Sequence, residues 1–182
     1  RAFSLRPGQT DDFAQALQVL AEDGCWPERI VHLWSLSPPD TPDALLGFHT
    51  LTALAQAIGS RGQFEPTELA FVCSQVEEVT GDEPLSPRAA APLGAVTVIP
   101  QELQGLACRS IDIDIAPSVD ASDAYPELAE RLYRELTAQR RERRVALRGR
   151  FRWAQGFEAL AVARPADRPD RLKHQGVYLI TG

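Results

Sequence analysis

The residues that could do chemistry are few in this chain, and the first candidates are Asp112 and Asp114. They alternate with isoleucines in "IDIDI", and paired carboxylates can act as acid and base or hold a cation. Two residues apart on a strand, they point to the same side, which is also the polar side of an ordinary strand. Since nothing nearby in the sequence supplies a metal partner or a second base, we expect both aspartates to be solvated or hydrogen-bonded.

The three histidines do not complete a catalytic set. His32 lies inside "IVHLW", where a general base would need a nucleophile or a carboxylate partner, so we expect a strand histidine bonded to a neighbour. His49 falls within an apolar helix stripe and carries the same expectation. His174 lies in a polar linker and is expected to be solvated.

The cysteines predict neither a metal site nor a redox pair. Cys25, Cys73 and Cys108 are far apart, and no CxxC pair occurs. We expect reduced cysteines in the core of a cytosolic protein.

Phosphate-binding loops are absent from the interior of the sequence. There is no GxGxxG and no GxxxxGK[ST], and the turns "SLSPPDTP" and "CSQVEEVTGDEP" lack the glycines that let a backbone approach a pyrophosphate. The sequence ends in "VYLITG", a β-forming run that breaks into Thr181 and Gly182. A dinucleotide-binding unit begins in this way, so the pattern could mark a cofactor site or only the edge of one.

Arginines gather in "QRRERRVALRGRFRW", which holds seven of them beside two aromatic residues. The net charge of −6 argues against a general nucleic-acid or anionic-membrane binder. Arg148, Arg150 and Arg152 alternate along a predicted strand, so we expect them to contact another domain or an acidic partner. No apolar run has the roughly 18–20 residues needed to span a membrane.

The elements that must position these residues alternate between helix and strand. Apolar residues at i, i+3, i+4 and i+7 after Thr10 predict a first helix, and continuous apolar runs predict buried strands. Such alternation gives a parallel sheet with helices on both faces. The predicted strands are 3–5, 29–36, 68–74, 106–115, a strand pair or bent strand from Val145, and 177–180; further helices are predicted over 43–58, 87–98 and from Asp123.

Six stretches in one order resemble the N-terminal, structural half of the ketoreductase domain of modular type I polyketide synthases. No single stretch is decisive, but together they cover almost the whole chain. They are "PERIVHLWSL" (27–36), "LGFHTLTALAQAI" (46–58), "PLGAVTVIPQEL" (92–103), "CRSIDIDI" (108–115), "VALRGRFRW" (145–153) and "GVYLITG" (176–182).

The resemblance implies an α/β fold, a truncated Rossmann-like fold with a mostly parallel sheet and helices on both faces. Residues 1–163 would be the structural subdomain without its usual first strand–helix–strand unit, and residues 164–175 a linker. Residues 176–182 would be the first strand of a catalytic short-chain reductase subdomain. Thr181 and Gly182 match the first Thr and Gly of that subdomain's Thr-Gly-x-x-x-Gly-x-Gly motif.

The resemblance also implies a function without chemistry in this chain. It would support a downstream half that uses NADPH to reduce the β-keto group of a polyketide held on an acyl carrier protein. The parent chain would be a cytoplasmic, homodimeric enzyme, with neighbouring synthase domains as partners, and this chain would hold no cofactor, metal or catalytic residue itself. Two alternatives stay open: a pseudo-ketoreductase scaffold that organises neighbouring domains, and a free-standing small-molecule binding domain.

Overall fold

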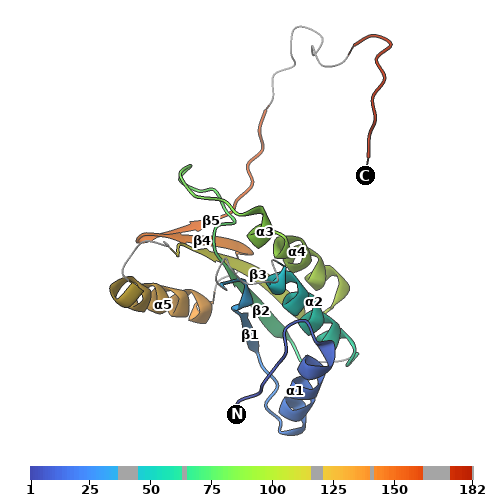
Figure 1. Cartoon of the computed structure of the whole chain (residues 1–182), viewed down its shortest axis with the longest axis vertical. Coiled ribbons are helices and arrows are strands. Elements are labelled where there is room, and N and C mark those ends of the chain that lie inside the picture. Colours follow the sequence, from blue (N-terminus) through green and yellow to red (C-terminus); the bar gives the residue numbers. More distant parts are fainter. Residues whose placement is uncertain (37–44, 63–64, 116–120, 140–141, 162–172, 182) are drawn as a thin grey trace.

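A five-stranded sheet forms the centre of the molecule (Figure 1). Its order is β1-β2-β3-β4-β5, with the first four strands parallel and β5 antiparallel to β4. The strands are β1 (Arg29–His32), β2 (Thr67–Cys73), β3 (Leu106–Ile113), β4 (Arg144–Arg148) and β5 (Phe151–Ala154). The computed structural model describes residues 1–36, 45–62, 65–115, 121–139, 142–161 and 173–181.

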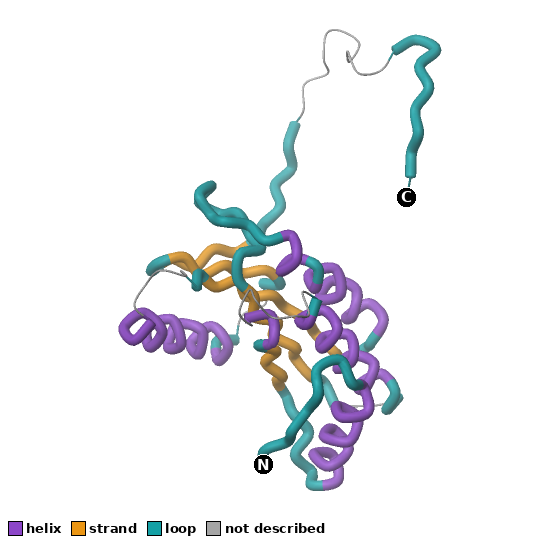
Figure 2. The backbone as a smooth tube through the Cα atoms, in the orientation of Figure 1, coloured by secondary structure: helices purple, strands orange, loops and turns teal. Residues whose placement is uncertain are grey.

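The helices lie on both faces of this sheet, which confirms the predicted fold class (Figure 2). Helices α2 and α4 cover one face, α1 packs against α2, and α5 covers the opposite face. The helices are α1 (Thr10–Glu22), α2 (Leu46–Gly59), α3 (Pro87–Ala90), α4 (Pro92–Glu102) and α5 (Ala121–Thr137), with a short 3-10 helix, η1 (Trp34–Leu36).

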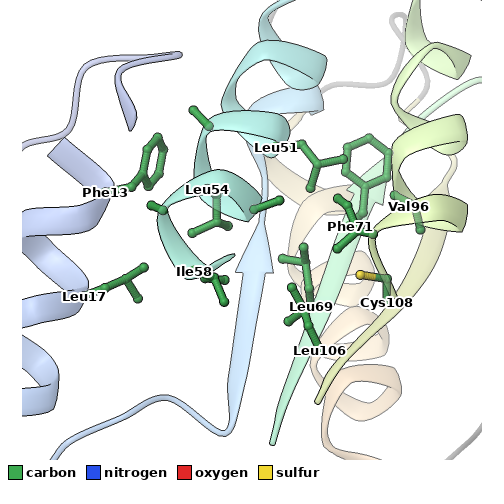
Figure 3. Packing of buried hydrophobic residues seen from close by; sticks show 14 of the residues in the cluster. Phe13, Leu17, Leu51, Leu54, Ile58, Leu69, Phe71, Val96, Leu106 and Cys108 are labelled. Atoms are coloured by element: carbon green, nitrogen blue, oxygen red, sulfur yellow. The ribbon is translucent and has the colours of Figure 1, made fainter. Parts of the chain in front are cut away.

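The larger core lies between the sheet and the helices α1, α2 and α4 (Figure 3). Leu69 and Phe71 of β2 point into it and meet Leu51 and Ile58 of α2, and all four are fully buried. A second core on the other face joins alternate residues of β2, β3 and β4 to the partly buried Leu128, Leu132 and Leu136 of α5. Because successive strand residues point to opposite faces, the inner strands bury both sets and read as continuous apolar runs.

Three predicted elements differ from the structure. Residues 3–5 form no strand. The strand predicted over 29–36 ends at His32, and Val31 is exposed because β1 is an edge strand. The helix predicted over 87–98 is two helices, α3 and α4, since Pro92 has no N–H to continue the first one.

The prediction from Val145 onward left two possibilities open, and the structure has a strand pair. β4 and β5 form an antiparallel hairpin in which Arg148 faces Phe151. Gly149 lies at the turn with φ +47°, a left-handed conformation that glycine adopts without a side-chain penalty. Arg148 and Arg152 therefore belong to different strands, and the prediction that Arg148, Arg150 and Arg152 alternate along one strand is wrong.

The strand predicted over 177–180 does not form in this chain, where residues 177–181 are an exposed loop. A strand needs hydrogen-bonded neighbours, and no other described segment pairs with these residues. The assignment of 176–182 to a second subdomain stays a prediction, as do the other domain boundaries; residues 164–172 of the linker lie outside the described part of the chain. None of the described helices has the length and hydropathy that crossing a membrane requires.

Candidate functional site

Three charged side chains meet at the carboxyl end of the sheet, where open α/β folds usually bind their ligands. Asp112 is the penultimate residue of β3, and Arg148 is the last residue of β4. Parallel pairing of β3 with β4 brings both to the same edge. Glu83 joins them from the loop that follows β2.

Arg148 is the centre of this site, and its contacts join three segments. Its Nη2 donates to Asp112 Oδ2 at 2.6 Å and to the carbonyl of Glu77 at 2.7 Å. Its Nε donates to Glu83 Oε1 at 3.2 Å, and its Nη1 donates to the carbonyl of Asp112 at 3.2 Å. The side chains of Arg148 and Asp112 are 9% and 1% exposed, so this is a buried ion pair.

The loop over residues 74–86 is folded around the same carboxylates. Asp112 Oδ2 accepts the amide of Glu77 at 3.0 Å and, at 3.4 Å, that of Val76. Glu83 accepts the amides of three consecutive residues in the loop, Val79, Thr80 and Gly81. We call the set of Asp112, Arg148, Glu83 and this loop the carboxyl-end latch.

The charges of the latch are set by these contacts. Amide hydrogen bonds, led by that of Thr80, lower the pKa of Glu83 to about 2 against the cost of partial burial. Burial raises the pKa of Asp112, and the guanidinium of Arg148 and the loop amides offset part of that rise. Burial alone would lower the pKa of Arg148. The hydrogen bonds and ion pairs that Arg148 makes with Asp112 and Glu83 have the larger effect, so the pKa is raised.

This arrangement can hold a loop on a sheet. Nε, Nη1 and Nη2 of Arg148 all donate to groups of the protein itself. A dinucleotide site needs a glycine turn whose backbone approaches the pyrophosphate. Here the turn after β2 is instead the loop held by Arg148.

A second ionic cluster lies on the opposite face, between β3, β5 and α5. Glu135 of α5 is buried and accepts Arg152 Nε at 2.7 Å as well as the guanidinium of Arg109. Arg152 also bonds Glu142 at 3.1 Å. Burial opposes ionisation of Glu135, but the hydrogen bonds from Arg152 and Arg109 prevail and lower its pKa.

The three arginines predicted to meet a partner therefore have separate roles. Arg148 and Arg152 are committed to internal carboxylates on opposite faces of the sheet. Arg150 is exposed in the hairpin turn, with its guanidinium 5.1 Å from the ring centroid of Phe151. The expectation of one shared contact face was wrong, because the hairpin reverses the chain between Arg148 and Arg152.

The aspartates and histidines are placed much as their types predict. Asp112 is hydrogen-bonded and Asp114 is exposed beyond the end of β3. His32 is buried, and its Nε2 lies 2.9 Å from Thr50 Oγ1, which confirms the bonded-neighbour prediction. His174 is exposed as predicted, whereas His49 is on the exposed side of α2 and not in its apolar stripe.

Burial explains the state of Cys73, Cys108 and His32, whereas Cys25 is exposed and not in the core as expected. It raises the pKa of Cys108 to about 12 and that of Cys73 well above its ordinary value, so neither thiol is a ready nucleophile. It lowers the pKa of His32 to about 4, so the imidazole is neutral near pH 7. Within the described residues, no group of three or more His, Cys, Asp or Glu side chains is placed to hold a metal ion.

The residues singled out at the end of the sequence are not brought to any of these clusters. Thr181 is exposed in the C-terminal loop, and Gly182 lies outside the described residues. Their contact with a cofactor stays a prediction. The sequence analysis did not identify Glu83, Arg109 and Glu135 as members of these clusters. The apolar strand "CRSIDIDI" contains charged residues such as Arg109, and buried charges require partners, so this strand did indicate that oppositely charged partners exist elsewhere in the chain.

Solved structures share this fold, although no family model and no curated protein matches the chain. One is the first ketoreductase of the tylosin polyketide synthase, with 19% identity over 84% of this chain and a TM-score of 0.64. Another is a multidomain structure with adenylation, ketoreductase and pseudo-Asub domains from a keto acid-selecting nonribosomal peptide synthetase module, with 22% identity over 84% of this chain and a TM-score of 0.63.

The match covers only part of those proteins. This chain spans 31% of the tylosin ketoreductase chain and 14% of the multidomain chain. At such identities the likeness establishes the fold. The chain has the truncated Rossmann-like α/β fold that is found within these ketoreductase-containing structures.

Proposed function

We propose that this chain is the structural, non-catalytic half of a polyketide synthase ketoreductase, and that it supports an adjoining NADPH-dependent half. The observation that carries the proposal is the carboxyl-end latch. In a nucleotide-binding sheet this edge is open to the ligand. Here Arg148 and Asp112 hold the loop over residues 74–86 against it.

Two further observations support the proposal. Six stretches of the sequence resemble the structural half of such ketoreductases in order and spacing, and the fold is shared with ketoreductase-containing structures. The polar clusters on both faces of the sheet join internal elements to one another. In this proposal the cofactor and the carrier-bound β-keto substrate contact the adjoining half, with Thr181 and Gly182 at the border.

Complementation tests this role directly. The measurement is NADPH-dependent reduction of a β-ketoacyl thioester by the adjoining half alone, by that half with this chain added, and by both in one polypeptide. We expect the half alone to be inactive or unstable, and activity to return when this chain is present. Full activity and stability of the half alone would contradict the structural role.

The same experiment separates the alternative functions. A scaffold that organises neighbouring domains would leave the complete polypeptide inactive, although correctly folded. A free-standing binding domain would make no difference to the activity of the adjoining half, whether present or absent.

A further inference from the structure

One carboxylate of the carboxyl-end latch is held in the way that a protein holds a bound anion. The amides of Val79 and Thr80 donate to Glu83 Oε1 at 3.0 and 2.9 Å, and the amide of Gly81 donates to Glu83 Oε2 at 2.9 Å. Arg148 Nε donates to Glu83 Oε1 at 3.2 Å. Three consecutive amides and one guanidinium therefore converge on the two oxygens of a single carboxylate.

The backbone of residues 79–81 forms an anion-binding nest. Successive amides that point to one side create a concavity of positive potential, and phosphate-binding loops use the same arrangement. Gly81 has φ +94°, a conformation that favours glycine, and its amide joins the other two on the same carboxylate. Arg148 lies 65 residues from Glu83, so the tertiary fold adds a positive charge to what the local loop provides.

This group of donors lies near the surface of the molecule. The side chain of Glu83 is 10% exposed, and the neighbouring Thr80, Gly81 and Asp82 are exposed. Asp112, the other carboxylate that Arg148 binds, is 1% exposed and lies within the sheet. A small molecule from solvent could therefore reach the donors around Glu83 without opening the core.

The donors would still need an acceptor if the side chain of Glu83 were absent. Buried N–H groups that lose their acceptor cost free energy, and hydrogen bonds to a charged acceptor are the stronger ones. In the unmodified chain an anion from solvent competes poorly, because Glu83 is tethered beside the nest and has a high effective concentration. We therefore expect exchange only when the side chain of Glu83 is removed.

We propose that residues 79–81 and Arg148 form a carboxylate-binding site whose resident ligand is the side chain of Glu83. A small external carboxylate binds the same donors once that side chain is removed, and in the unmodified chain Glu83 keeps the site closed to anions from solvent. The inference concerns the loop itself and does not depend on the proposed function.

Chemical rescue of the 182-residue chain tests this site. The variant Glu83→Ala removes a CH₂–COO⁻ fragment, and acetate is the matching small molecule. We expect about 100 mM sodium acetate at pH 7 to lower the unfolding equilibrium constant of this variant about tenfold relative to sodium chloride of equal ionic strength, as a Kd of about 10 mM gives. The amide resonances of Val79, Thr80 and Gly81 should move toward their positions in the unmodified chain.

Two variants serve as controls. Glu83→Gln fills the site with an uncharged side chain, and Asp82→Ala removes an equal charge from the exposed neighbouring residue. Rescue of Glu83→Ala alone supports the proposal. An equal response of all three variants would show a general effect of acetate and would overturn it.

The remaining outcomes also decide the question. If acetate stabilises Glu83→Ala no more than sodium chloride does, or leaves the three loop amides unshifted, the proposal is wrong. If Glu83→Ala is unfolded in sodium chloride, recovery of the native fold in acetate becomes the readout, and failure to recover it would again overturn the proposal.

Discussion

Removing the charge of Arg148 should release the latch and destabilise the fold. The variant Arg148→Met keeps much of the apolar stem but removes every donor of the guanidinium. It leaves the carboxylate of Asp112, which is 1% exposed, without its counter-charge, and it leaves the carbonyl of Glu77 without a donor. Breaking a buried pair from one side costs about 3–5 kcal/mol, so we expect a loss of that size in the free energy of unfolding at pH 7.

A double-mutant cycle isolates the pair from the rest of the latch. Asp112→Asn retains an oxygen for the amides of Val76 and Glu77, so its cost should be about 2–3 kcal/mol. In the double variant residue 112 carries no charge and Glu83 keeps its three amide hydrogen bonds, so the cost should fall short of the sum by about 1–3 kcal/mol. Urea unfolding of the four proteins measures these differences.

The loss in free energy of unfolding caused by Arg148→Met should also depend on pH, which provides a second test. Without the guanidinium, burial raises the pKa of Asp112 further above its unfolded value. The native state then binds a proton that the unfolded state releases, so the variant loses stability as pH rises. The penalty should be smaller at pH 5 than at pH 8.

A surface pair supplies the control for this series. Arg134 pairs with Glu130 across one helical turn, with side chains 72% and 54% exposed, so Arg134→Met should cost less than about 1 kcal/mol. If Arg148→Met cost no more than this control, and the cycle showed no coupling, the reasoning about the latch would be refuted.

Three further predictions concern titration and reactivity. Because the folded pKa of Glu83 is lowered to about 2, its contribution to stability is present above its unfolded pKa and is lost as pH falls toward 2; Glu83→Gln should flatten the acid limb of an unfolding curve. His32, with its pKa lowered to about 4, should show no NMR titration between pH 6 and 8, and stability should decline as pH falls from about 6.5 toward 4; a midpoint near 6.5 would contradict its burial. A thiol reagent should modify the exposed Cys25 quickly in the native chain, while Cys73 and Cys108 react only on unfolding; rapid modification of all three would contradict the packing of β2 and β3.

The parts of the fold that depend on local pattern could be predicted from the sequence. Continuous apolar runs gave the inner strands β2 and β3 to within a residue or two, and helical spacing after Thr10 gave α1. Local pattern gave wrong predictions where the structure of a segment depends on its neighbours in the fold. β1 reads as a buried strand, but it lies at an edge, and "VYLITG" reads as a strand, whereas residues 177–181 are an exposed loop.

The site was less predictable because its members are far apart in sequence. Arg148 lies 36 residues from Asp112 and 65 from Glu83, and no spacing rule connects them. Asp112 itself gave a partial signal, since a carboxylate inside an apolar strand must find hydrogen bonds. Which partner it finds depends on the β3–β4 register and on the hairpin turn at Gly149, and these follow from tertiary pairing.

The central proposal is that this chain supports an adjoining reductase half and that its own sheet does not bind the NADPH cofactor. Calorimetric titration of the 182-residue chain with NADPH tests this most directly, with a reductase of known NADPH affinity as the positive control. The account predicts a Kd weaker than about 1 mM, or less than about 4 kcal/mol of binding free energy. A Kd near 1 μM, about 8 kcal/mol, would contradict it and would mean that the carboxyl end of the sheet opens to a nucleotide despite the latch.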